Sequence, residues 1–154
     1  GCSNNFYGAV DFSAWCDSCA MRTRGNIWTD SAGSGGEAKR SSVSGISWVD
    51  ESLGVLYDFL NEASQLDSTI IVVLSDNGEA KGTVFEYGIR TMMHVRYPPA
   101  IAAGTIVNDP VTSIDIVPSI FALAGIYGAY DTDGTSWEPL VTGATTTIGR
   151  ATII

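Results

Sequence analysis

An aspartate, an asparagine and a lysine lie close together near the middle of the sequence. Asp76 and Asn77 directly follow the apolar run Ile70–Leu74 and a serine, and Lys81 comes shortly after them. Carboxylate and carboxamide oxygens are hard donors of the kind that hold calcium or magnesium. Because Gly78 follows, a plain Asp-Asn-Gly turn that only shapes the backbone is a second interpretation. On these residues alone, the turn is the stronger of the two.

Three cysteines near the start of the chain offer another kind of chemistry. They are Cys2, Cys16 and Cys19, and the last two have a Cys-x-x-Cys spacing. That spacing suits a redox pair or half of a zinc site. No second cysteine pair and no nearby histidine completes a zinc site, so zinc is disfavoured. A disulfide, with one cysteine left for a partner outside this chain, is the simpler interpretation.

The elements around Asp76 predict how it is positioned. The run Ile70–Leu74 is short and mostly β-branched, which is typical of a strand buried on both faces, as in the middle of a parallel sheet. The carboxyl end of such a strand is where open α/β sheets bind ligands. Before it, apolar residues at helical spacing predict a helix from Ser47 to near Gln65, begun by a capping-box-like pair of Ser47 and Asp50.

The sequence after the Asp-Asn-Gly segment predicts further strands and one more helix. A helix is expected to begin with a capping box at Thr112 to Asp115 and to end at Leu123, before Gly125. The remaining expected segments are a strand over Met92–Tyr97, an extended stretch over Val107–Val111 and an edge strand within Thr145–Ile154. Helices and strands in this order predict an α/β fold.

The composition restricts the classes of function. The chain has 154 residues, is 45% hydrophobic and carries a formal net charge of −9. Its length suits one domain or part of a larger one. The negative charge argues against binding to nucleic acid or to anionic membrane surfaces. No stretch has the ~20 apolar residues of a membrane span. Residues 1–46 are rich in glycine and serine, and we assign them no role.

Several motifs occur in an order that resembles one family. They are Ile46–Gly54, Leu-Ser-Asp-Asn-Gly at 74–78, Lys-Gly-Thr-Val-Phe-Glu-Tyr-Gly-Ile-Arg at 81–90, Val-Arg-Tyr-Pro at 95–98, Ser-Ile-Asp-Ile-Val-Pro at 113–118 and Asp-Gly-Thr-Ser-Trp-Glu-Pro-Leu at 133–140. Together they resemble the C-terminal part of the catalytic domain of type I sulfatases, which belong to the alkaline-phosphatase superfamily. The resemblance implies that residues 47–154 form an α/β segment, part of a sulfatase-like sheet flanked by helices.

The resemblance also implies a chemistry. Type I sulfatases hydrolyse sulfate esters with a formylglycine nucleophile and a calcium ion, with magnesium as an alternative. Carried over by motif, Asp76 and Asn77 would be metal ligands, and Lys81 would contact the sulfate or the leaving oxygen. A dianion-like transition state requires such positive charge in a water-excluding site. The expected location is a secreted, periplasmic or lysosomal-type compartment.

Important parts of the family pattern are absent from this sequence. Its nucleophile motif, Cys-x-Pro-x-Arg, is missing, because the segment Cys16–Arg24 has no proline and the wrong spacing. The paired acidic ligands of the first strand and the catalytic histidines are also missing, and His94 is expected to be a core or cross-strand residue. Between Gly78 and Lys81 only two residues intervene, and Tyr87 replaces a glycine, so Lys81 ranks below the two proposed ligands.

Three other polar residues have structural interpretations. The spacing of Glu86 and Arg90 suits an internal ion pair, and Asp115 is expected to cap its helix.

Two hypotheses of different classes follow. In the first, the chain is a fragment or half of a sulfatase that contributes metal and sulfate ligands and is inactive alone, so its partner is the missing half of the domain. In the second, it is a non-catalytic, self-assembling structural subunit derived from a sulfatase fold. Phosphatase or phosphodiesterase chemistry is a third alternative, but the Lys-Gly-Thr signature favours sulfatases.

Overall fold

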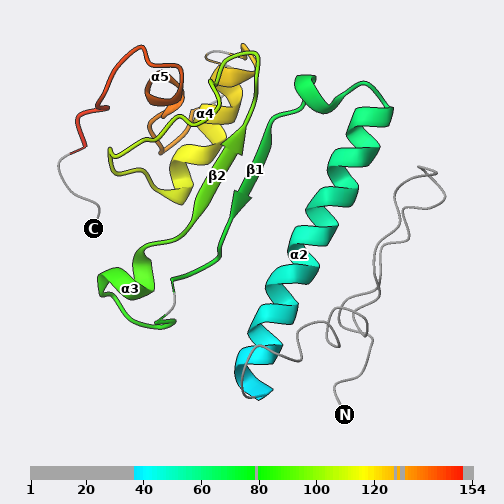
Figure 1. Cartoon of the computed structure of the whole chain (residues 1–154). Coiled ribbons are helices and arrows are strands. Elements are labelled where there is room, and N and C mark those ends of the chain that lie inside the picture. Colours follow the sequence, from blue (N-terminus) through cyan, green and yellow to red (C-terminus); the bar gives the residue numbers. More distant parts are fainter. Residues whose placement is uncertain (1–36, 79, 127, 129–130, 151–154) are drawn as a thin grey trace. The chain divides into compact units, whose positions relative to one another are not determined.

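The computed structural model describes residues 37–78, 80–126, 128 and 131–150 (Figure 1). The chain divides into two compact units, residues 1–66 and 67–154. Its elements, in order, are α2 (Glu37–Glu62), η3 (Leu66–Ser68), β1 (Ile71–Leu74), α3 (Glu86–Ile89), β2 (Met93–Arg96), η4 (Ser113–Asp115), α4 (Ile116–Leu123) and α5 (Glu138–Val141). The cysteine predictions at positions 2, 16 and 19 lie outside the described residues.

Helix α2 confirms the predicted helix but begins earlier than expected. The predicted start at Ser47 is wrong, because the helix already runs from Glu37. The segment Glu-Ala-Lys-Arg that opens it consists of good helix formers, so Ser47 lies inside the helix and caps nothing. The predicted end is close to the observed one. After Glu62, Ser64 has a positive φ of 57°. The Gln65 N–H donates to the carbonyl of Leu60, as in a Schellman motif.

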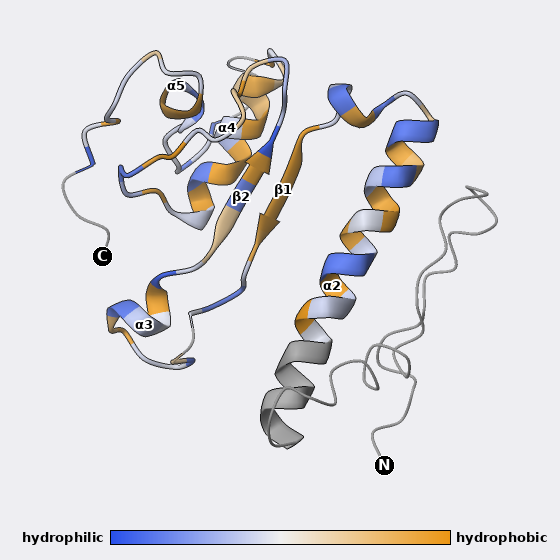
Figure 2. Cartoon of the chain, viewed as in Figure 1, coloured by the Kyte–Doolittle hydropathy of each residue, from blue (hydrophilic) through white to orange (hydrophobic). Residues whose placement is uncertain are grey.

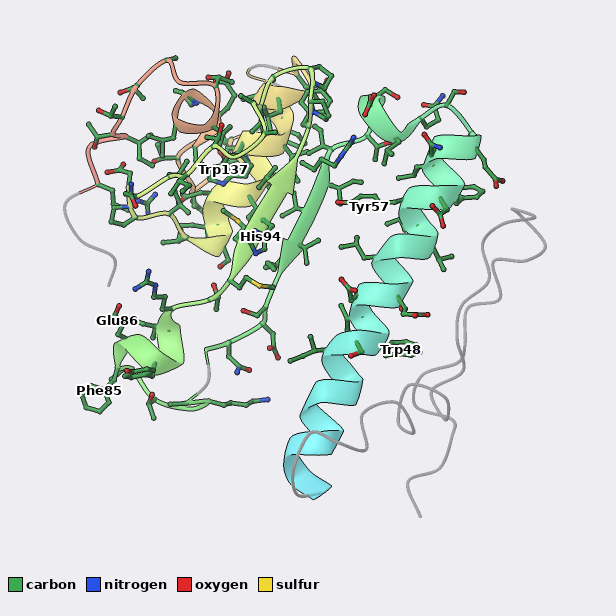
Figure 3. The ribbon with its side chains drawn as sticks, in the orientation of Figure 1. Trp48, Tyr57, Phe85, Glu86, His94 and Trp137 are labelled. Atoms are coloured by element: carbon green, nitrogen blue, oxygen red, sulfur yellow. The ribbon has the colours of Figure 1, made fainter. Side chains whose placement is uncertain are left out.

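Strands β1 and β2 form an antiparallel pair. Val72 lies opposite Val95, and Val73 lies opposite His94. Figure 3 labels His94 on β2. The prediction that β1 lies within a parallel sheet is therefore wrong for the pairing that the structure describes. A parallel neighbour needs a crossover connection, usually a helix, whereas the loop from 75 to 92 folds back directly like a hairpin. Burial along β1 also decreases from Ile71, which is buried, to Leu74, which is exposed.

One face of β2 covers the hydrophobic core of residues 67–154. The core centres on Leu123 of α4, Trp137 just before α5, and Leu140 of α5. Met93 and Val95 of β2 pack against it. These two β2 residues share a face because side chains alternate along a strand. Other half-buried residues that pack on the core are Ile70, Tyr97, Ala100, Ile101, Val107, Val111, Val141 and Ile148. Figure 2 shows that β1 is hydrophobic along its length.

Helix α4 begins as the sequence predicts. The Thr112 side chain and the Asp115 carboxylate form a reciprocal capping box over η4, and the Thr112 N–H donates to Asp115 Oδ2 at 2.7 Å. The helix ends at Leu123, and Gly125 has a positive φ of 74°. A left-handed glycine just after a helix satisfies its last carbonyls, so both predicted ends of this helix are confirmed.

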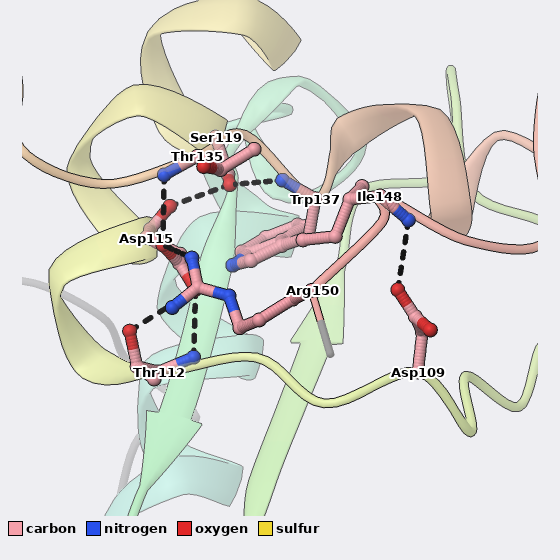
Figure 4. Close-up of polar contacts among 8 residues, drawn as sticks. All are labelled: Asp109, Thr112, Asp115, Ser119, Thr135, Trp137, Ile148 and Arg150. Atoms are coloured by element: carbon pink, nitrogen blue, oxygen red, sulfur yellow. Dashed lines mark hydrogen bonds and ion pairs between the residues drawn. The ribbon is translucent and has the colours of Figure 1, made fainter. Parts of the chain in front are cut away.

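The carboxylate of Asp115 does more than cap a helix. It is fully buried, accepts the Thr135 N–H at 2.8 Å and pairs with Arg150 Nη2 at 2.7 Å (Figure 4). One turn later, Ser119 accepts the N–H of the fully buried Trp137 at 2.8 Å. These bonds fasten the segment from Thr135 to Arg150 onto the start of α4.

The electrostatic state of Asp115 follows from these contacts. Burial by itself would raise the pKa of the carboxyl. The backbone N–H groups of Thr112 and Thr135, the Thr112 hydroxyl and the Arg150 guanidinium outweigh that effect and hold the pKa below its usual value. Asp115 is therefore the charged partner of a buried ion pair at neutral pH.

The edge strand expected within residues 145–154 is not present in the described part of that range, and residues 107–111, expected to be extended, are not paired as a strand. Residues 107–111 and 145–150 form loops in the structure, and residues 151–154 lie outside the described part. Asp109 instead accepts the Ile148 N–H at 2.8 Å, which joins the two segments by a single side chain. Helix α5 was not anticipated, although Pro139 in its first turn is a typical start signal.

The fold class is α/β, as predicted, with helices and a two-stranded sheet. Helix α2 crosses the boundary proposed between residues 46 and 47, and the compact units divide after Leu66. That residues 47–154 form one sulfatase-like segment stays a prediction. Among the described residues, no helix is long and apolar enough to cross a membrane.

The Asp115 cluster predicts an acid-dependent stability. Replacing Asp115 by Asn should lower the free energy of unfolding at pH 7 by about 3 kcal/mol, because Arg150 and several donors lose a buried charged partner. Since the folded pKa is depressed, this stabilisation is fully present above the unfolded pKa of about 3.9. It is lost as the pH falls through the folded pKa. Urea denaturation of both proteins at several pH values measures the difference.

A matched control is Asp67→Asn. Asp67 pairs with Arg96 at 2.6 Å, but its side chain is 79% exposed, so the loss should stay below about 1 kcal/mol. The Asp115 result would be contradicted by a difference between wild type and variant that stays the same from pH 7 to pH 2.5.

Candidate functional site

The loop between β1 and β2 carries all three residues that the sequence singles out, Asp76, Asn77 and Lys81. Its base is closed by two hydrogen bonds between Ser75 and Met92. The Ser75 N–H donates to the Met92 carbonyl at 3.0 Å, and the Met92 N–H donates to Ser75 Oγ at 3.0 Å. The serine of the Ser-Asp-Asn-Gly motif thus fixes the point at which Asp76 leaves the strand.

Two glycines hold the sides of this loop together. The Gly78 N–H donates to the Gly88 carbonyl at 2.9 Å, and the Ala80 N–H donates to the Tyr87 carbonyl at 3.0 Å. A Cβ added at Gly78 would collide with the Tyr87 carbonyl oxygen and lie 2.9 Å from that of Arg90. Only glycine allows the backbones to come this close, so Gly78 is required by contact rather than by a turn.

Lys81 stands in a tight turn. The Thr83 N–H and hydroxyl both donate to the Ala80 carbonyl, at 3.2 Å and 2.9 Å. Gly82 occupies the third position of the turn with a φ of +84°, which is the pattern of a type II turn. A Cβ at Gly88 would collide with Thr83, so Gly88 packs directly against this turn. The Lys-Gly-Thr signature therefore has a local physical reason.

Asp76 and Asn77 both lie in the first part of the loop. Asp76 is exposed and Asn77 is half-buried. Asn77 Nδ2 donates to the Gly78 carbonyl at 2.6 Å, which leaves Oδ1 as the oxygen available to an outside partner. Among the described residues, no three His, Cys, Asp or Glu side chains form a group that could hold a metal ion.

Glu86, Tyr87 and Arg90, in the second half of the loop, have structural roles and no part in the candidate site. Arg90 pairs with Glu86 at 2.8 Å across α3, and both side chains are largely exposed, so the predicted internal ion pair is confirmed. Tyr87, which replaces a glycine of the signature, points its side chain outward and is 75% exposed. The loop accommodates this departure because only the Tyr87 carbonyl takes part in the close contact with Gly78.

His94 is a cross-strand residue, as predicted. It lies opposite Val73 in the strand pair and is exposed, so the alternative that it belongs to the core is wrong. Its neighbours Met93 and Val95 occupy the core face, and alternation along β2 therefore turns His94 to the other face.

Sequence reasoning missed two residues that build this loop. Ser75 closes its base, and Thr83 fixes the turn that contains Lys81. The pattern Lys-Gly-Thr contained a signal for the second, because glycine at the third position of a turn predicts a positive φ.

Comparison with known proteins identifies the family of this chain. The family model described as sulfatase matches residues 8–126. The chain belongs to the sulfatase family. This confirms the resemblance to sulfatases, while placement in the C-terminal part of the domain stays a prediction.

Individual sulfatases share about a third of the matched residues with this chain. The N-acetylglucosamine-6-O-sulfatase of Bacteroides thetaiotaomicron is 33% identical over 101 residues, which are 60% of this chain and 18% of the relative. The extracellular sulfatase SULF-1 homolog of Drosophila melanogaster is 31% identical over 102 residues, again 60% of this chain but 9% of the relative.

A solved structure supports the same family and the α/β fold. It is described as a complex with its substrate D-glucosamine-2-N,6-O-disulfate, and it matches with a TM-score of 0.62 at 28% identity. The match covers 74% of this chain and 26% of the solved chain. This chain therefore spans only a small part of the length of the sulfatases that it resembles.

The loop contacts predict how glycine substitutions differ. Gly78→Ala should cost about 3 kcal/mol of unfolding free energy, because the new Cβ meets the Tyr87 carbonyl and the backbone must separate. Gly82→Ala should cost only about 1–2 kcal/mol, since space is open there and only the left-handed φ is strained. Urea denaturation measures both changes.

Gly54→Ala is the control, because Gly54 lies inside α2 with open space around its Cα and should be neutral or stabilising. Equal losses at Gly78 and Gly82 would contradict the close contact.

Proposed function

We propose that this chain is the part of a sulfuric ester hydrolase that supplies metal and sulfate ligands. The observation that carries the proposal is that Asp76, Asn77 and Lys81 share one loop whose backbone is fixed by the glycines and threonine of the family signature. A fixed backbone presents side chains at a constant spacing, which a site for an anion and a cation requires.

The available donor atoms fit a calcium ion, with magnesium as the alternative. Asp76 offers an exposed carboxylate, and Asn77 keeps its Oδ1 available because Nδ2 is bound to Gly78. Both donors are hard oxygens. Calcium takes about six to eight oxygen ligands, so two residues are a part of a site and further ligands come from elsewhere. When bound, the ion would supply positive charge for a sulfate group.

Lys81 would bind the same anion. It is exposed, and the turn that contains it is anchored by Thr83. An ammonium group near the sulfate or the leaving oxygen stabilises the negative charge that develops during hydrolysis. The substrate is a sulfate ester, and a sulfated amino sugar is the first to test, because two of the compared proteins are described with such substrates.

We propose a secreted, periplasmic or lysosomal-type location. One of the compared relatives is named an extracellular sulfatase. The formylglycine nucleophile is proposed to come from outside this chain, because the 154 residues contain no Cys-x-Pro-x-Arg motif.

The isolated chain should therefore be inactive. We expect no hydrolysis of an aryl sulfate or of glucosamine 6-sulfate by the purified 154-residue protein, with or without added calcium, because nucleophile and metal site are incomplete. The measurement is sulfate release over hours, with the Bacteroides sulfatase as a positive control. Activity that a chelator abolishes would sink this part of the proposal.

A chimeric enzyme tests the three ligands directly. Residues 67–150 of this chain replace the corresponding segment of the Bacteroides sulfatase. In this chimera Asp76→Ala, Asn77→Ala and Lys81→Ala should each lower kcat/KM by about 100-fold or more, because each removes charge stabilisation from the transition state. Asp133→Ala is the control, since Asp133 is exposed and lies outside the loop. An active chimera in which all three variants keep full activity would refute the ligand assignment.

A further inference from the structure

The loop that carries the candidate ligands also displays a cluster of exposed apolar side chains. Val84 is 85% exposed, Phe85 and Tyr87 are each 75% exposed, and Ile89 is 57% exposed. We refer to these four residues as the loop patch. Figure 3 shows Phe85 at the outer end of the loop, pointing away from the strands. Exposed apolar residues that occur singly are common, whereas four within six positions indicate an interaction surface.

The exposure of the loop patch does not come from a loosely held backbone. The loop is tied across by the bonds from Gly78 to Gly88 and from Ala80 to Tyr87. The only two charged residues between Val84 and Arg90 neutralise each other, because Glu86 pairs with Arg90 at 2.8 Å. The loop thus holds a nearly neutral apolar surface in a fixed shape, on a chain whose net charge is −9.

We propose that the loop patch is the surface on which the remainder of a sulfatase domain docks. This inference rests on the proposed function and names the partner of that same site. The relatives carry the additional chain that could cover it, since this chain matches only 18% of the Bacteroides sulfatase and 26% of the solved structure. The loop also holds only part of a metal site, so the covering segment and the missing ligands would arrive together.

A second copy of this chain is the less favoured occupant. Each copy carries nine net negative charges, and their approach would be opposed electrostatically. The described sheet also has only two strands, fewer than an independent sheet needs, so each strand has an edge without a neighbouring strand in the described part of the chain. A larger domain would supply strands for the edges of the sheet and would also cover the loop patch.

The test compares the full chain with the chimera described above. Phe85→Ser and Tyr87→Ser are made in both. Docking predicts that each variant lowers the Tm of the chimera by about 3 °C or more, because a side chain buried there becomes polar. In the full 154-residue chain the same variants should change the Tm by less than about 1 °C.

Phe85→Leu, which keeps an apolar side chain, should largely preserve the Tm of the chimera. Ile106→Ser is the matched control, since Ile106 is 81% exposed and lies outside the loop.

Three results would overturn the proposal. A folded, active chimera whose Tm is unaffected by the serine variants rejects the docking surface alone and leaves the proposed function intact. Serine variants that lower the Tm of the full 154-residue chain as much as that of the chimera show that these side chains already pack within this chain, which also rejects the docking surface. A full chain that forms a dimer by light scattering and becomes monomeric with Phe85→Ser assigns the patch to a second copy instead.

Discussion

The close approach of two backbone segments at Gly78 and Gly88 is the constraint on which the candidate site depends. The hydrogen bond between them brings the start and the end of the loop together. Any side chain at Gly78 would separate the segments, and any side chain at Gly88 would push on the turn that contains Lys81. The positions of Asp76 and Lys81 are therefore coupled through main-chain contacts, although the two side chains have no shared partner among the described residues.

Two ion pairs of similar length illustrate how burial changes the effect of a charge. Asp115 and Arg150 are 2.7 Å apart, and Glu86 and Arg90 are 2.8 Å apart. The Asp115 carboxylate is fully buried and is held by further N–H donors, so its charge organises the C-terminal segment. The Glu86 pair is exposed to solvent, where water screens the attraction, and contributes little to stability. Its effect is local, because it leaves the outer surface of the loop nearly neutral.

The sequence predicted best those features that are determined by residues close together in the chain. The capping box at Thr112 and Asp115, the glycine after α4 and the pair of Glu86 and Arg90 each depend on residues within a few positions, and each prediction is confirmed. The error in the strand pairing arose because that outcome depends on a distant segment. The apolar run before Asp76 indicates a strand, but it contains nothing about the direction of its neighbour. The start of α2 was misplaced because Ser47 and Asp50 match a capping pattern even inside a helix.

The site itself was less predictable than the fold, for a related reason. Sequence motifs indicated Asp76, Asn77 and Lys81, but they could not indicate whether other oxygen donors lie beside the two proposed ligands. A cation of this kind needs about six to eight oxygens, and the described residues offer no cluster of three acidic, histidine or cysteine side chains. The same loop exposes apolar side chains that a soluble surface disfavours. Both features are explained together if the loop forms one side of a larger site. Such a loop supplies only some of the ligands, and its apolar side chains contact the rest of the domain.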